Sequence, residues 1–351
     1  MKLSCLPACI GLLFALCLPL SAAEQKAKSP ADVASDEFFQ LREDRAAKPG
    51  PERFQKLIAS GVGFITQHPT HRRASAAIAS LATFGMTMRD KNQAALRASW
   101  LPALKFELVN QRYNEKLDDD AKAAVAALES AVAGMEARET FSRDTAAVYR
   151  TKIDALAAMP AGGRFLFDQE REYLELLTLG SPKLAEAQAQ ILAEHTDKKF
   201  AMLGKDQLSL AEIRKQPYEL KFTSIDGRPV DVGQLRGKVV LLTFWSAANE
   251  GSIKEQMALR DAVAEYRKQV EIVGVAYDKA EDREKVLKAI KANGLTWPHH
   301  FEGKGSDVGF GEKLAVRNLP TLVLFDQKGM LVGQGRVGQL APELKRLLAK
   351  K

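Results

Sequence analysis

Cysteine is nearly absent from this sequence, and its placement is more informative than its number. The chain has 351 residues and three cysteines, Cys5, Cys9 and Cys17, so no cysteine follows residue 17. A structural disulfide, a thiolate nucleophile and a sulfur-ligated metal all require cysteine. These three kinds of chemistry are therefore excluded for residues 18–351.

Long apolar runs and a strong charge of one sign are also missing. Hydrophobic residues make up 46% and charged residues 27% of the chain, and 51 basic against 44 acidic residues give a net charge of +7. This composition excludes a disordered, a collagen-like or a multi-span membrane protein, and the mild positive charge does not indicate a nucleic-acid partner. The length favours two domains, because single cores seldom grow beyond about 250 residues.

The first 23 residues have the pattern of an export signal. A positive start at Lys2 precedes an apolar stretch from Leu6 to Leu20, and small residues follow at 21–23. This order predicts a signal peptide cleaved after Ala23, a periplasmic or secreted protein, and no stable membrane insertion afterwards. An uncleaved anchor or a lipoprotein is an alternative, but the apolar run is short for a membrane span. Cleavage would remove all three cysteines.

Residues 24–215 are expected to form an α-helical domain. Apolar residues recur there at spacings of three and four, and Pro and Gly separate the segments. The pattern predicts a bundle or a stack of helical hairpins, with a tetratricopeptide-type array as an alternative. His68, His71 and His195 lack metal-ligand spacing and are interpreted as surface residues. The expected helices span 51–67, 71–88, 92–113, 118–137, 141–158, 163–178 and 182–203.

In residues 216–351 the spacing of apolar residues differs from that of the helical half and is typical of an α/β domain. Continuous apolar runs such as 239–245 predict strands buried on both faces, and helical patterns follow them. Trp297 is expected in the core, while His299 and His300 should point to opposite faces of a strand and so not share a metal. The expected strands are 218–222, 239–245, 271–276, 319–325 and 330–332, and the expected helices are 249–268, 280–293 and 342–349.

Two motifs in this half carry a family resemblance. The segment from Arg236 to Trp245 (RGKVVLLTFW) and the later one from Asn318 to Leu322 (NLPTL) stand in the same order as the elements just described. In this arrangement residues 217–351 resemble the thioredoxin fold of the AhpC/TSA and TlpA-like thiol-disulfide oxidoreductases. Shorter features agree with it at 225–230, 294–298 and 326–329.

The resemblance implies a Cys-x-x-Cys motif at the start of the helix that follows Trp245, but this sequence departs from it. Asn249 and Ser252 occupy the two cysteine positions. Neither side chain can form a disulfide, and no histidine lies in the motif to activate the serine. We therefore expect no catalytic residue here. Asn is among the best N-cap residues, so capping of the helix competes with ligand contact as its role.

The resemblance also implies a cis bond before Pro320, opposite the Asn249 turn. A cis Leu319–Pro320 bond would leave the backbone of Leu319 free to pair with an extended peptide. An alternative is that Pro320 serves the turn of the fold and nothing else. The candidate binding residues are Trp245, Asn249, Ser252, Leu319 and Pro320.

The sequence thus predicts an exported two-domain protein whose thioredoxin-like half, residues 216–351, lacks the redox cysteines. The leading hypothesis is a redox-inactive protein that binds a protein or an extended peptide, with no metal and no cofactor. One alternative is a thiol-disulfide or antioxidant function exercised with a cysteine-bearing partner. Another is that the helical domain, residues 24–215, is the functional interaction module.

Overall fold

The structure is a computed structural model that describes residues 28–44, 51–74, 76–78, 80–81, 94–305 and 309–349. The expected signal peptide, residues 1–23, and part of the expected helix 71–88 lie outside these residues. The chain divides into two compact units. One comprises Met1–Met135 with Asp154–Gly163, and the other Glu136–Ile153 with Arg164–Lys351.

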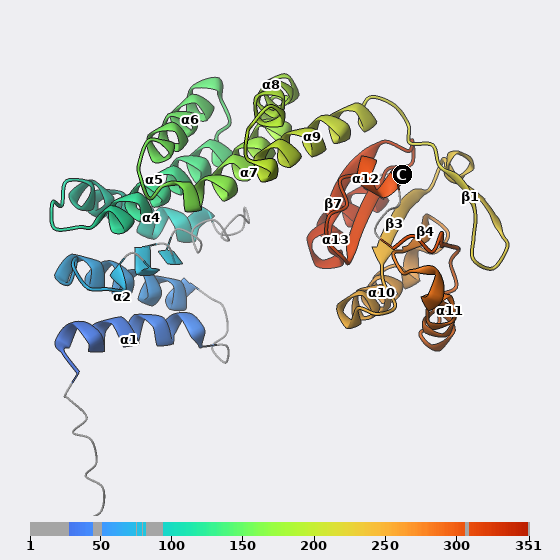
Figure 1. The fold of residues 1–351 in the computed structure, drawn as a ribbon, viewed down its shortest axis with the longest axis horizontal. Helices are drawn as coiled ribbons and strands as arrows, with labels where there is room; N and C mark the ends of the chain where they lie inside the picture. The colour runs from blue at the N-terminus through green and yellow to red at the C-terminus, as the bar shows by residue number, and fades with distance from the viewer. Residues whose placement is uncertain are drawn as a thin grey trace, which may run out of the picture. The chain divides into compact units, whose positions relative to one another are not determined.

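The first unit is helical in its described residues, as the apolar spacing predicts. Its described helices are α1 (Pro30–Glu43), α2 (Pro51–Gln67), α4 (Ala94–Arg112) and the first part of α5 (Asp119–Glu139) (Figure 1). The apolar residues Phe38 of α1 and Leu57 and Phe64 of α2 are buried, and the seven-residue spacing of Leu57 and Phe64 places them on one face of α2. Helix α2 has the predicted bounds, whereas α1 is not among the predicted helices.

The helices that follow in the chain are α6 (Arg143–Ala157), α7 (Gly163–Gly180), α8 (Pro182–Ala193) and α9 (Lys198–Ile213). The predicted single helix 182–203 is wrong, because it consists of α8 and the start of α9. Asp197 causes the restart: its carboxylate accepts the backbone N–H of Lys199 at 3.0 Å and caps α9. The two helices then pack closely where Gly204 meets the backbone of α8.

The C-terminal part contains a mixed five-stranded sheet in the order β5-β4-β3-β6-β7. Strand β3 pairs in parallel with β4 and antiparallel with β6, and all seven of its residues are buried. A separate hairpin of β1 (Lys221–Thr223) and β2 (Pro229–Asp231) precedes the sheet. The sheet strands are β3 (Val239–Trp245), β4 (Val270–Ala276), β5 (His299–His300), β6 (Thr321–Phe325) and β7 (Leu331–Gly335).

Helices cover both faces of this sheet, so the core has two layers. Leu241 and Trp245 of β3 belong to the layer that includes residues of α10 (Glu250–Ala262), α11 (Arg283–Ala292) and α13 (Val337–Ala349). Leu242 and Phe244 belong to the opposite layer, beside α12 (Gly309–Lys313) and α9. Gln256 of α10 ties helix to sheet: its buried Nε2 donates to Thr243 Oγ1 at 2.6 Å.

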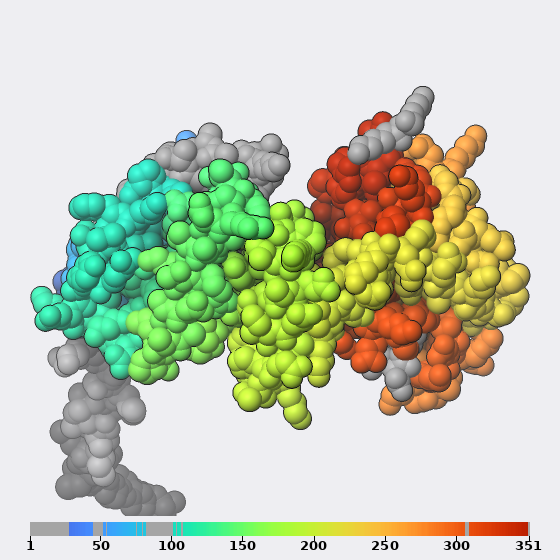
Figure 2. Space-filling model, turned by 90° about the horizontal axis from the view of Figure 1, so that it is seen from above, coloured from blue at the N-terminus to red at the C-terminus, as the bar shows by residue number. Residues whose placement is uncertain are grey.

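Several expected bounds are corrected by this arrangement. Helix α10 ends at Ala262 rather than 268, where a 3-10 turn follows, and α13 begins five residues before Pro342. Glu255 of α10 accepts the N–H of Val337, which supplies a partner for the first turn of α13. In Figure 2 the yellow, orange and red residues of the C-terminal part are gathered together.

Among the described residues, no helix combines the length and the apolar character needed to cross a bilayer.

Candidate functional site

Strand register brings three segments to one edge of the sheet. Phe244, next to the end of β3, pairs with Val275 of β4 and with Thr321 at the start of β6. The turn after β3, the residues after β4 and the residues before β6 therefore meet at the same edge. The carboxyl ends of parallel strands are where α/β proteins usually place their sites. The Leu319–Pro320 bond at this edge is cis, as expected.

Asn249 caps α10 at this edge, which confirms the expected capping role. Its Oδ1 accepts the backbone N–H of Ser252 at 2.9 Å, and its backbone is extended (φ −109°, ψ 107°). Such a cap contributes about 1 kcal/mol to stability. Glu250 at the first helical position carries its negative charge near the positive end of the helix dipole and pairs with Lys254 at 2.6 Å.

Asp278 anchors the same turn from the neighbouring strand. Its carboxylate is buried, with the residue 4% exposed, and accepts the Ser246 hydroxyl at 2.8 Å and the Ala247 N–H at 3.0 and 3.1 Å. Hydrogen bonds to a carboxylate are stronger than neutral ones. Asp278 therefore fixes the backbone that leads into Asn249. Sequence reasoning missed it, although an Asp two residues after a buried strand was a usable signal.

Burial divides the five expected binding residues. Trp245 and Ser252 are 0% exposed and Pro320 is buried, so these three side chains do not line an accessible groove. Trp245 points into the core layer beneath α10, and Ser252 faces inward from the first turn of that helix. The expectation of contact through these three side chains is corrected. Asn249 is exposed and Leu319 is half-buried.

Leu319 offers its backbone rather than a deep side-chain pocket. Within the part of the chain that the structure describes, neither its N–H nor its C=O has a hydrogen-bond partner. Its side chain packs against the core layer that holds Phe244. A backbone unit with unpaired polar groups at the start of a strand can accept an added extended chain.

The same region matches known proteins. A family model described as thioredoxin-like matches residues 237–331. The thioredoxin-like protein YneN of Bacillus subtilis is 26% identical over 133 residues, which are 38% of this chain and 75% of that protein. The thiol-disulfide oxidoreductase ResA of Halalkalibacterium halodurans is 28% identical over 125 residues, 35% of this chain and 68% of that protein.

Residues 237–331 form a thioredoxin-like domain. The part of the chain that contains this domain is homologous to YneN and to ResA. Among solved structures, a thiol-disulfide oxidoreductase from Bacteroides fragilis aligns with 38% of this chain and 98% of its own, at 23% identity and a TM-score of 0.35.

The two adjacent histidines of the thioredoxin-like domain point to opposite faces, as predicted. His299 packs between Trp245 and Trp297, with ring centroids 5.4 and 5.8 Å away, and Trp297 is 8% exposed, in the core as expected. His300 packs against Phe310 on the other face. Burial lowers the pKa of His299 to about 4. No group of three metal-binding side chains occurs among the described residues.

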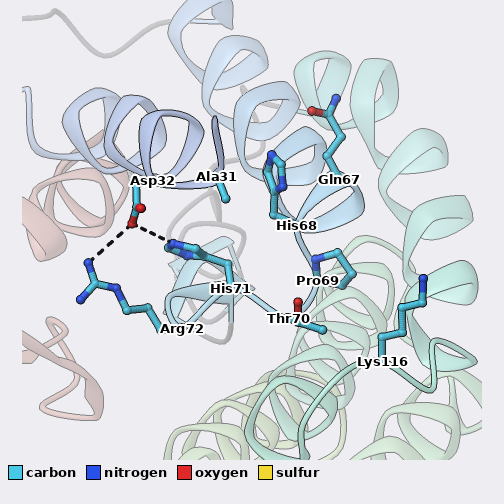
Figure 3. Close-up of a pocket in the computed structure, with 9 residues that line it drawn as sticks. All are labelled: Ala31, Asp32, Gln67, His68, Pro69, Thr70, His71, Arg72 and Lys116. Atoms are coloured by element: carbon cyan, nitrogen blue, oxygen red, sulfur yellow. Dashed lines mark hydrogen bonds and ion pairs between the residues drawn. The ribbon is translucent and has the colours of Figure 1, made fainter. Parts of the chain in front are cut away.

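A pocket of about 570 Å³ lies in the first unit (Figure 3). Asp32 on its wall contacts His71 at 3.2 Å and Arg72 at 3.6 Å, and hydrogen bonds from Ser29 and His71 lower the pKa of Asp32 to about 2. The side chain of His71 is 11% exposed, so its interpretation as a plain surface residue is corrected.

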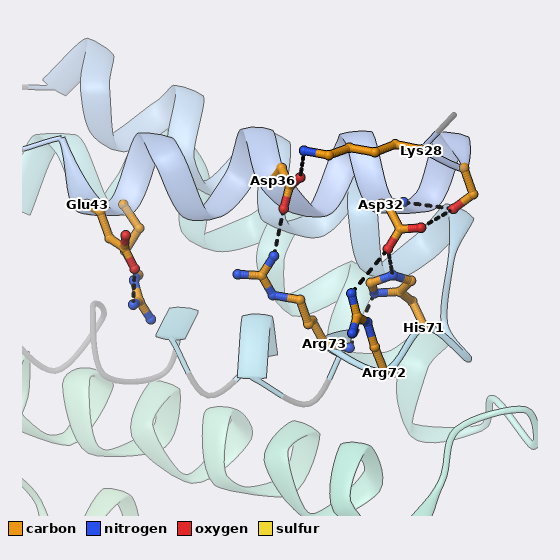
Figure 4. A network of polar contacts seen from close by, with 9 residues as sticks. Lys28, Asp32, Asp36, Glu43, His71, Arg72 and Arg73 are labelled. Carbon is orange, nitrogen blue, oxygen red and sulfur yellow. Dashed lines mark hydrogen bonds and ion pairs between the residues drawn. The ribbon is translucent and has the colours of Figure 1, made fainter. Parts of the chain in front are cut away.

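These contacts belong to a wider network that joins α1 to the segment after α2. Asp36 of α1 contacts Lys28 at 2.6 Å and Arg73 at 2.8 Å (Figure 4). Each carboxylate therefore faces at least one cation or histidine. The arrangement tethers α1 to that segment, because its two carboxylates face three basic side chains, Lys28, Arg72 and Arg73.

Proposed function

We propose that the thioredoxin-like domain binds a protein segment or an extended peptide at the sheet edge formed by the Asn249 turn and Leu319, without thiol-disulfide exchange of its own. The observation that carries this proposal is the combination at one edge of an unpaired Leu319 backbone with a helix start that holds no cysteine. The relative ResA bears the name of an oxidoreductase. In this chain Asn249 caps the helix instead.

Binding would follow the geometry of strand addition. An extended peptide can donate to the C=O of Leu319 and accept from its N–H, and the adjacent Thr321 already continues into β6. Each such hydrogen bond contributes only about 0.5–1.5 kcal/mol net. Selectivity would therefore come from side chains beside the added strand, of which Asn249 is exposed and Leu319 half-exposed.

We further propose that residues 1–23 are a cleaved signal, so that the protein acts in the periplasm or is secreted. Lys2, the apolar stretch and the small residues at 21–23 support this part of the proposal. The cleaved chain would contain no thiol, in a compartment where partner proteins form disulfides.

The binding proposal is tested with an unfolded polypeptide that has no free thiol, reduced and carboxymethylated ribonuclease A. Fluorescence anisotropy should show binding to the wild-type protein. Binding to Leu319→Glu should be at least about tenfold weaker, because a charged carboxylate replaces the apolar side chain beside the Leu319 backbone. Leu179→Glu is the matched control, since Leu179 of α7 is 81% exposed. No binding to the wild type, or equal loss in both variants at equal thermal stability, would contradict the proposal.

The redox half is tested separately by insulin reduction in the presence of dithiothreitol. The protein purified from the cell envelope should not accelerate insulin precipitation above the rate that dithiothreitol gives without the protein. Acceleration that scales with protein concentration and survives removal of residues 1–23 would overturn this half of the proposal.

A further inference from the structure

Helix α9 makes two polar contacts with the segment that leads into the cis-proline. Arg317 Nε donates to Asp206 Oδ2 at 3.0 Å, and Arg317 Nη2 donates to Oδ1 of the same carboxylate. Ser209 Oγ donates to the backbone carbonyl of Lys313 at 2.7 Å. The side chain of Asp206 is 16% exposed, so this two-point ion pair is partly shielded from water. Residues 206 and 209 lie one helical turn apart on the same face.

The same face of α9 also enters the core of the domain. Leu210 is 6% exposed and belongs to the layer formed by alternate residues of β3, including Leu242 and Phe244. Ile213 is partly buried against the same layer, and so is Leu319. Helix α9, which precedes the expected domain boundary at 216, therefore contributes apolar side chains to the core layer against which Leu319 packs.

The intervening segment, residues 313–318, is held at both of its ends. Leu314 is 0% and Val316 6% exposed, and the N–H of Val316 donates to the Gly311 carbonyl at 3.0 Å. Ala315 between them has φ = +53°, a left-handed conformation that is strained for a non-glycine residue and persists only where its surroundings hold it. The contacts from α9 flank this residue at Lys313 and Arg317.

We infer that α9 is a positioning element of the thioredoxin-like domain, and that the pair of Asp206 with Arg317, together with Ser209, sets the backbone course from Lys313 to Leu319. The thioredoxin-like domain thus receives contacts from α9, a helix that precedes the sequence-based boundary at 216. The positioning of residues 313–319 is inferred from these contacts alone. Its effect on peptide binding rests on the proposed function at Leu319.

Hydrogen exchange of the full chain, followed by mass spectrometry, tests the positioning directly. Asp206→Asn removes the charge at constant size, and we expect the hydrogen-bonded amides of residues 314–316 to exchange about tenfold faster. Glu212→Gln is the matched control: Glu212 also lies on α9, but it pairs with Lys215, which follows the end of that helix. The control should leave exchange of residues 314–316 unchanged.

Charge reversal distinguishes positioning from a general loss of stability. Asp206→Arg should speed exchange of residues 314–316, and the double variant D206R/R317D should restore slow exchange there. Faster exchange confined to α9, or the absence of restoration in a folded double variant, would overturn the inference.

The binding consequence has its own readout. If the wild-type protein binds carboxymethylated ribonuclease A, D206N should weaken binding severalfold and D206R/R317D should restore it. Unchanged binding in D206N, despite faster exchange at 314–316, would overturn the consequence but not the positioning. A wild type that does not bind would contradict the proposed function and leave the exchange result as the test of positioning.

Discussion

Asn249 and Ser252 have different surroundings, although the family resemblance assigns cysteines to both positions. Asn249 is exposed and its amide oxygen closes the first turn of α10. Ser252 is fully buried, and its hydroxyl has no partner among the described residues. A thiol suits the second position, since cysteine is a small residue that tolerates burial better than an unpaired hydroxyl. At the first position a cysteine would lose a cap worth about 1 kcal/mol.

The double variant N249C/S252C is therefore expected to fold and to form a reducible disulfide at the start of α10. Thiol titration of the unfolded protein, prepared without residues 1–23, should find two thiols after reduction and none after air oxidation. The single variant S252C should retain one thiol under both conditions. A folded double variant that keeps two thiols after oxidation would show that these residues do not have the spacing of a Cys-x-x-Cys motif.

His299 should make stability depend on pH. Its pKa is lowered to about 4 by burial, whereas an unfolded chain keeps the ordinary value near 6.5. Between these values the unfolded state binds more protons, so the free energy of unfolding rises with pH across the window. The full difference is up to about 3 kcal/mol. Above pH 6.5 and below pH 4 this residue contributes no further slope.

Urea unfolding of His299→Phe between pH 4 and 7 checks this expectation. The variant keeps an aromatic ring between the tryptophans and should show a flatter pH dependence. Some slope should remain because burial also lowers the pKa of His300. Equal slopes in the variant and in the wild-type protein would contradict the assignment.

At the scale of elements, the α8–α9 hairpin depends on one glycine. A Cβ on Gly204 would stand 2.3 Å from the Ala193 nitrogen and 2.5 Å from the Ala189 carbonyl oxygen, so both helix backbones would have to separate. Gly204→Ala is expected to destabilise the protein by about 1–3 kcal/mol despite the higher helix propensity of alanine.

Gly63 of α2 provides the matched control for this substitution. A Cβ at Gly63 would meet nothing within 4 Å, so Gly63→Ala should be neutral or stabilise by up to about 1 kcal/mol. Thermal unfolding of both variants distinguishes the two cases. A Gly204→Ala variant as stable as wild type would mean that the helices do not approach this closely.

Sequence patterns predicted elements best where one local signal dominated. The buried run 239–245 became β3 and the amphipathic segment 51–67 became α2 with unchanged bounds. The break at Asp197 was missed because apolar spacing continues across it, and capping by a single carboxylate decided the structure. The burial of Ser252 was missed for a related reason, since helix orientation on a sheet depends on packing partners far along the chain.

At the scale of the whole molecule, the contacts that shape the candidate site are not local. Asp206 and Arg317 are 111 positions apart, and Asp278 reaches Ala247 across 31 positions. Motif order predicted the thioredoxin-like fold and the cis-proline. It could not predict which side chains from distant elements hold that edge, because each of them looks like an ordinary surface charge in the sequence.

Maturation is the last property of the whole molecule that can be tested. The protein isolated from the cell envelope should have the mass of a chain beginning at Glu24, and titration under unfolding conditions should find no thiol. Leu13→Arg interrupts the apolar stretch and should retain the precursor with three thiols. An envelope protein that keeps Cys17, free or lipidated, would contradict cleavage after Ala23. A free Cys17 would also restore a thiol to the exported chain, outside the thioredoxin-like domain, so the absence of exchange chemistry at Asn249 would no longer extend to the protein as a whole.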